Sequence, residues 1–152
     1  MHLSRRAAVI HLAAAMAVAT GLTPLAAAGR GDLARSGAVT ITVHYKGQGT
    51  VDARHKIWIW VFDTPDIGPT AMPVREESLA VNGGSIAVDG LGPDRVWIAV
   101  GYDERGDSAG NAPPAPGSPI GIYSADGGAP TGLITTDRPA AVVTFDDSLR
   151  MP

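Results

Sequence analysis

The most constraining feature of this 152-residue sequence is the stretch Ile57–Phe62, IWIWVF, in which every side chain is apolar. Successive side chains on a β-strand point to opposite faces. Ile57, Ile59 and Val61 therefore lie on one face, and the three aromatic residues lie on the other. Both faces must be covered. We expect one face to meet the core of the domain, whereas the other is covered either by loops of the protein itself or by a ligand or partner.

Other short stretches also have the composition of strands. Residues 38–45 alternate between apolar and polar side chains, which predicts a strand with one solvated face. Residues 82–84, Asn-Gly-Gly, are typical of a tight hairpin turn. β-Branched residues and Gly/Pro turns dominate the chain after residue 37, and no amphipathic helix pattern competes with them. The sequence therefore predicts an all-β fold, a single antiparallel β-sandwich of six or seven strands. The predicted strands are 38–45, 56–62, 74–81, 85–88, 95–102, 120–123 and 140–145, and 132–136 is a further candidate for an edge segment.

Residues 1–28 have the layout of a secretory signal peptide. Two arginines, Arg5 and Arg6, precede an apolar, alanine-rich run, and Ala26 and Ala28 stand where signal cleavage needs small residues. No other segment approaches the roughly 20 apolar residues of a membrane span, so we expect no span after cleavage. The arginine pair also fits part of a twin-arginine signal, which leaves both the Sec and the twin-arginine routes open.

The expected domain organisation follows from this signal. Residues 29–37 are predicted to be a flexible leader, and residues 38–152 the β-sandwich domain. The chain has no cysteine, so it has no disulfide, no thiolate nucleophile and no sulfur ligand for zinc. An exported bacterial domain of this kind, periplasmic or secreted, must be held together by packing.

The charge of the exported part excludes one class of partner. Residues 29–152 contain all 15 acidic residues and 10 of the 12 basic ones, a formal charge of −5. Such a surface repels phosphate backbones, and no Lys/Arg cluster opposes the repulsion, so we expect no nucleic acid partner. The partners that remain are an envelope protein or a glycan.

Three motifs occupy the second half of the chain: RVWIAVGYDERGD at 95–107, GSPIGIY at 117–123 and VVTFDDSLRMP at 142–152. Together they resemble bacterial periplasmic domains of the transthyretin-like and carboxypeptidase-regulatory-like β-sandwich group. The resemblance implies a small exported sandwich of immunoglobulin-like or transthyretin-like architecture, and it brings no catalytic residues. It departs at Arg105–Ser108, where the group has N-G-N-G. The residues that match are Tyr102, Asp103 and Glu104, then Gly117, Pro119, Gly121 and Tyr123, and finally Phe145, Asp146 and Asp147.

The acidic loop that follows residues 95–102 raises the question of calcium. Asp103, Glu104 and Asp107 offer hard oxygen ligands, and calcium accepts irregular shells of roughly six to eight oxygens. The loop fails at three informative positions of the twelve-residue calcium-binding template, which favours a solvated turn. A calcium cofactor held by these three carboxylates is therefore a subordinate hypothesis.

Catalytic constellations are missing from the sequence. After residue 28 only His44 and His55 could act as a histidine base, and neither stands near an elbow-type serine or a second histidine at metal spacing. Carboxylates are paired at 76–77 and 146–147, but neighbouring strand residues point to opposite faces, so neither pair presents two acids to one bond. We therefore expect no enzymatic activity.

Trp58 and Trp60 are the candidate ligand-binding residues. Two tryptophans spaced two apart on a strand form an aromatic row of the kind that binds sugars. Burying both would contribute up to about 8 to 12 kcal/mol, comparable with the whole stability of about 5 to 15 kcal/mol of a typical domain. This magnitude favours rings covered by the proline-containing segments 63–73 and 103–119.

Simple alternation of strand direction predicts that Asp63 and Asp103, where these two segments begin, lie at opposite ends of the sandwich. This arrangement excludes a composite site built from both segments. The leading functional hypothesis is an exported, non-enzymatic binding or accessory module of the bacterial envelope. The alternatives are a carbohydrate-binding module that uses Trp58 and Trp60, or a calcium-stabilised domain.

Overall fold

The strands form where side chains alternate or are β-branched. The computed structural model describes residues 37–152 apart from residues 69 and 111, so the expected signal peptide at 1–28 and all but the last residue of the leader at 29–37 lie outside the described residues. The elements are β1 (Gly37–Tyr45), β2 (Ile57–Phe62), β3 (Arg75–Leu79), β4 (Ser85–Leu91), β5 (Arg95–Tyr102), β6 (Ile120–Ile122), β7 (Leu133–Ile134), the 3-10 helix η1 (Thr135–Asp137) and β8 (Ala140–Phe145).

The strands are arranged in two sheets, which confirms the all-β sandwich. One sheet has the order β4-β1-β8, and the other has the order β3-β2-β5-β6, with β7 paired to the start of β5. Eight strands are present among the described residues rather than six or seven, because the predicted edge segment 132–136 forms the two-residue β7 and continues into η1.

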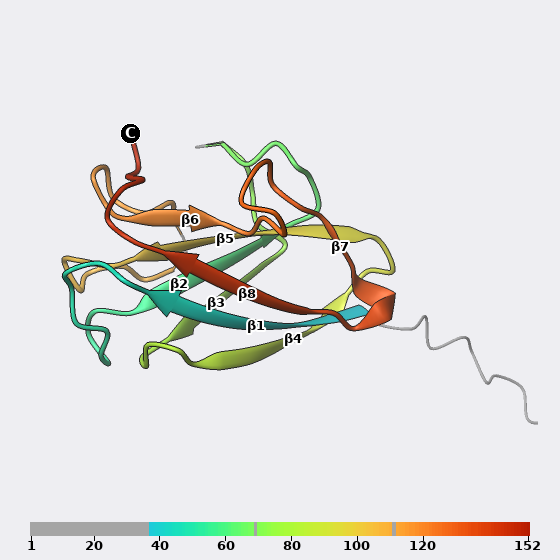
Figure 1. Ribbon diagram of the computed structural model, residues 1–152, viewed down its shortest axis with the longest axis horizontal. Helices are drawn as coiled ribbons and strands as arrows, with labels where there is room; N and C mark the ends of the chain where they lie inside the picture. Colours follow the sequence, from blue (N-terminus) through green and yellow to red (C-terminus); the bar gives the residue numbers. More distant parts are fainter. Residues whose placement is uncertain (1–36, 69, 111) are drawn as a thin grey trace, which may run out of the picture. The chain divides into compact units, whose positions relative to one another are not determined.

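The pairing of β1 with β8 is parallel, which is the one exception to the predicted antiparallel arrangement among the described strand pairs. Figure 1 shows the arrows of β1 and β8 pointing the same way. The cause lies in the connection before β8. Thr135 of η1 donates hydrogen bonds to the carbonyls of Gly92 and Asp94, which brings the chain to the end of the sandwich where β1 begins. From there β8 runs alongside β1, with Thr40 opposite Ala140.

The core lies between the two sheets and consists of the alternate residues that face inwards. Each Val or Ile that is fully buried there contributes about 1.5 to 3 kcal/mol. At one end of the core the rings of Tyr45 and Tyr102 stack with centroids 4.4 Å apart, and Phe145 lies 5.0 Å from Tyr45. The buried hydrophobic core is formed by Val39, Ile41, Val43, Tyr45, Ile57, Ile59, Val61, Val88, Leu91, Val96, Ile98, Val100, Tyr102, Ala141, Val143 and Phe145.

A carboxylate holds the aromatic end of the core in place. The hydroxyl of Tyr45 donates a hydrogen bond of 2.5 Å to Oδ1 of Asp147, whose Oδ2 accepts the backbone N–H of Gln48. The hydrogen bond from Tyr45 holds the pKa of Asp147 below its ordinary value. Burial, together with the carboxylate of Asp147, raises the pKa of Tyr45.

Acidification is expected to destabilise the domain. The pKa of Asp147 is lower in the folded chain than in the unfolded one, so its stabilising contribution is present above the ordinary pKa of 3.8 and is lost as the pH falls through the folded value. The pKa of Tyr45 is raised, so its contribution is present below the ordinary value of 10.0 and is lost as the pH rises towards the folded value. Urea denaturation midpoints recorded across the pH range measure the loss of stability at both low and high pH.

Two substitutions test whether Asp147 and Tyr45 cause the loss of stability at acid and at alkaline pH. Asp147→Asn should make the loss of stability in acid less steep. Tyr45→Phe should make the loss in alkali less steep and also weaken the dependence in acid, because it removes the hydrogen bond that lowers the pKa of Asp147. An Asp147→Asn protein that loses stability in acid as steeply as the wild type would contradict the assignment.

Candidate functional site

The outer face of the five-stranded sheet carries the second row of β2 side chains. Trp60 and Phe62 are 5% and 6% exposed, and Trp58 is partly buried. Neither Trp60 nor Phe62 belongs to the core between the sheets. Loops cover them instead, which confirms the interpretation that these rings are part of the scaffold rather than an open aromatic row. Of the two rings in the carbohydrate-binding alternative, Trp60 is therefore buried, whereas Trp58 keeps part of its surface exposed.

The segments 63–73 and 103–119 provide the cover. Strands β2 and β5 pair antiparallel, with Ile57 opposite Tyr102, so Asp63 and Asp103 leave the sheet at opposite ends, as predicted. Both loops nevertheless fold back over the same outer face, and both line one cavity. The predicted exclusion of a composite site is therefore wrong, because these loops are long enough to return across the strands from which they depart.

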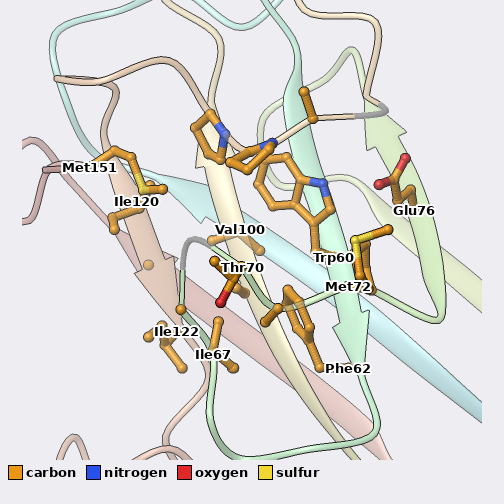
Figure 2. A pocket seen from close by; sticks show the side chains of 18 of the residues that line it. Trp60, Phe62, Ile67, Thr70, Met72, Glu76, Val100, Ile120, Ile122 and Met151 are labelled. Carbon is orange, nitrogen blue, oxygen red and sulfur yellow. The ribbon is translucent and has the colours of Figure 1, made fainter.

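The cavity has a volume of about 310 Å³ and lies over β2, β5 and β6. Figure 2 shows Trp60, Phe62 and Ile122 around it, with Met72 next to Trp60 and with Met151 beside Ile120. Its lining is almost entirely apolar. Among the described residues that line it, Thr70 and Glu76 are the only ones with a hydroxyl or a charged side chain, and the indole N–H of Trp60 donates to the carbonyl of Gly110 at 3.5 Å.

Different segments contribute the walls of the cavity. Ile67 and Met72 come from the 63–73 loop, Pro113 and Pro114 come from the 103–119 loop, and Met151 comes from the segment after β8. Sequence reasoning missed these residues as members of a site, since loops show no periodicity that reveals which side chains point back towards a sheet. The available signal was that two proline-containing segments flank a strand that is apolar on both faces.

Asp103 holds the 103–119 loop in its folded-back conformation. Its carboxylate is buried, with the residue 8% exposed, and it accepts the backbone N–H groups of Gly106 and Ser108, each at 2.9 Å. Further along the loop, Gly110 adopts φ +86° and lies directly against the ring of Trp58, where a Cβ atom would overlap the indole. The loop thus needs a carboxylate at its start and a glycine at its contact with the sheet.

The three carboxylates of the calcium hypothesis are used separately. Both oxygens of Asp103 accept hydrogen bonds from its own loop, and Glu104 forms an ion pair with Arg150 at 3.1 Å. Asp107 is exposed. Within residues 37–152, leaving aside 69 and 111, no group of three or more His, Cys, Asp or Glu side chains could hold a metal ion. The structure therefore does not bring Asp103, Glu104 and Asp107 together.

The environment of Trp58 differs from that of Trp60. The ammonium group of Lys56 lies 5.9 Å from the centroid of the Trp58 ring, within the range of a cation–π contact. The indole N–H of Trp58 is buried, and no described residue accepts a hydrogen bond from it. Trp58 does not line the 310 Å³ cavity, whereas Trp60 does. The two candidate ligand residues therefore do not act as a pair at that cavity.

Neither His44 nor His55, the histidines among the described residues, lies at the cavity. His44 is exposed on β1, in the other sheet, and His55 pairs with Asp52 in the turn before β2, with Nδ1 3.2 Å from Oδ1. Hydrogen bonds from the backbone of His55 and Arg54 hold the pKa of Asp52 below its ordinary value. No described residue that lines the cavity is a histidine, lysine, cysteine or serine.

No helix in the part of the chain that the structure describes is long and apolar enough to span a membrane. No protein-family model matches the chain, and no curated protein matches it. Among solved structures, the chain is similar to an alternative pilotin from the type II secretion system of Vibrio cholerae, with a TM-score of 0.43 and 10% sequence identity over 72% of this chain and 96% of that one. The resemblance to transthyretin-like domains remains an expectation from the sequence.

Proposed function

We propose that this chain is an exported, non-enzymatic binding module of the bacterial envelope and that the cavity over Trp60 binds the apolar part of its ligand. Export is supported by the signal-like residues 1–28, and the binding role by the cavity. An envelope protein that inserts an apolar side chain and a small apolar molecule are both compatible with this chemistry.

The observation that carries the proposal is the volume of the cavity together with its lining. The space is partly open to solvent, and a concave site lined mainly by apolar side chains with a few polar groups is typical of a ligand-binding pocket. An apolar cavity of about 150 Å³ is enough to hold one benzene ring. With about 310 Å³ between Trp60 and the two loops, the site has room for two rings or a medium-length alkyl chain.

The lining also argues against a sugar and against catalysis. A sugar needs several hydrogen-bonding groups, whereas Thr70 and Glu76 are the only lining side chains among the described residues with a hydroxyl or a charge. Catalysis by acid and base needs a pair of groups positioned at one bond. A lone carboxylate and a lone hydroxyl do not supply that pair.

Titration with 1-octanol tests the proposal. Each buried methylene contributes about 0.8 kcal/mol, reduced by the cost of ordering the chain, so we expect saturable binding with a dissociation constant below about 1 mM. Binding to the folded state should raise the melting temperature and change the fluorescence of Trp60. A panel of soluble glycans should give no response, and a saturable glycan response would favour the carbohydrate alternative.

A cavity-filling variant provides the control. Ala99 lies opposite Trp60 in the sheet and lines the cavity, so Ala99→Leu should occupy the space and abolish the octanol response. Val142→Leu changes a side chain of the other sheet that is 58% exposed and should leave the response intact. The proposal fails if octanol gives no saturable signal, or if Ala99→Leu binds octanol as the wild type does.

A further inference from the structure

We propose that the ligand of this cavity carries a basic group, so that the site takes a cationic amphiphile with its apolar body over Trp60 and its amine at Glu76. The inference rests on the proposed function and adds to it the charge of the ligand. It starts from Glu76, which among the described residues is the one charged side chain in the lining of an otherwise apolar cavity.

Strand register places Glu76 at the edge of the cavity. In the pairing of β2 with β3, Glu76 lies directly opposite Trp60, and the two side chains therefore share the outer face of the sheet. Side chains directly opposite each other in an antiparallel pair have Cβ atoms about 4.5 to 5.5 Å apart. Figure 2 shows Glu76 beside Trp60 and Met72 at one side of the cavity.

The carboxylate of Glu76 is available to a ligand. It forms no hydrogen bond or ion pair with any described residue, and it is solvent-exposed. Its neighbour Arg75 points to the other face, and the guanidinium group donates to the carbonyls of Val74 and Gly90 at 2.8 and 3.0 Å. The nearest cation in the sequence is therefore engaged elsewhere.

A cation at this position would be attracted by the carboxylate of Glu76, which supplies the opposite charge and forms no ion pair with any described residue. The formal charge of −5 on residues 29–152 adds a long-range attraction for cations. An anionic amphiphile of the same length would place its charge beside Glu76 and be repelled. The carboxylate of Glu76 thus discriminates by charge between ligands that the apolar lining alone would bind equally well.

Three probes of equal chain length test the inference: n-octylammonium, 1-octanol and octanoate, titrated into the wild-type protein at low salt. We expect octylammonium to bind about three- to tenfold more tightly than octanol, and octanoate to bind most weakly. In Glu76→Gln the ammonium and the alcohol should bind alike, and octanoate should bind more tightly than to the wild type. Raising the salt concentration should reduce the wild-type preference, because both charges lie near the surface.

Glu77→Gln is the matched control, because it removes the same charge one residue along β3, on the opposite face. It should keep the wild-type preference. If the three probes bind the wild type equally, or if the preference for ammonium survives in Glu76→Gln, the inference about the basic group is wrong while the apolar site stands. If none of the three binds, the apolar site and the inference are both wrong.

Discussion

Trp60→Ala is expected to lower the free energy of unfolding by about 3 to 5 kcal/mol and to abolish octanol binding. Trp60 is 5% exposed, and its ring is packed between the sheet and the 103–119 loop, where Gly110 accepts its N–H and Pro114 lies close to it above Gly101. Removing the indole deletes the packing of this loop and one side of the cavity together. Urea denaturation measures the first effect, and titration with octanol measures the second.

Two further variants distinguish the contribution of Trp60 to stability from its contribution to octanol binding. Trp60→Phe keeps a ring in place and should recover most of the stability, since it leaves a smaller cavity than alanine. Trp58→Ala removes a ring that is only partly buried and does not line the cavity, so it should cost less and leave octanol binding in place. A loss below about 1 kcal/mol in Trp60→Ala would show that the domain does not depend on this ring.

Local patterns in the sequence determine most of the strands. The alternation in 38–45, the apolar run at 57–62 and the β-branched run at 140–145 all appear as strands with nearly the predicted bounds. The parallel pairing of β1 with β8 could not be predicted in the same way, because side-chain periodicity is the same for either strand direction. That direction depends on the tertiary contacts of Thr135, which lie far away in the sequence.

The candidate site was predictable only in part. The position of Trp60 on the outer face follows from alternation along 57–62, and its burial follows from the free energy of covering a tryptophan. The wrong exclusion of a composite site came from treating a loop as if it stayed at the end where it begins. β2 spans roughly 20 Å, whereas a segment of the length of 103–119 reaches up to roughly 55 Å when extended, so it can easily return over the sheet.

The role of Asp103 likewise could not be predicted from the sequence alone. Its acidic neighbours suggested a metal ligand, but the structure uses the carboxylate to bind the backbone of its own loop. Aspartate followed by glycine and serine within five residues is also typical of side-chain-capped turns. Sequence spacing alone does not distinguish an oxygen that faces a cation from one that accepts N–H groups, since both uses need the same residue type.

Asp103→Ala is expected to lower the free energy of unfolding by about 2 to 3 kcal/mol, because two backbone N–H groups lose a buried, charged acceptor. The loop from residue 104 to residue 118 should then release its contact with Trp58. Urea denaturation measures the loss of stability. Faster amide hydrogen exchange and faster proteolysis confined to this loop, with a red-shifted tryptophan emission, would report its local opening.

Asp107, an exposed aspartate of the same loop, provides the matched control. Asp107→Ala removes an acidic side chain four residues later that accepts no hydrogen bond from the described residues, so its stability should stay within about 0.5 kcal/mol of the wild type. Loosening of the loop by Asp103→Ala should also weaken octanol binding, because Pro113 and Pro114 form one wall of the cavity. Equal stability and equal protection of the loop in the two variants would mean that the loop is held by its packing on Trp58 and Trp60 and not by the carboxylate at its start.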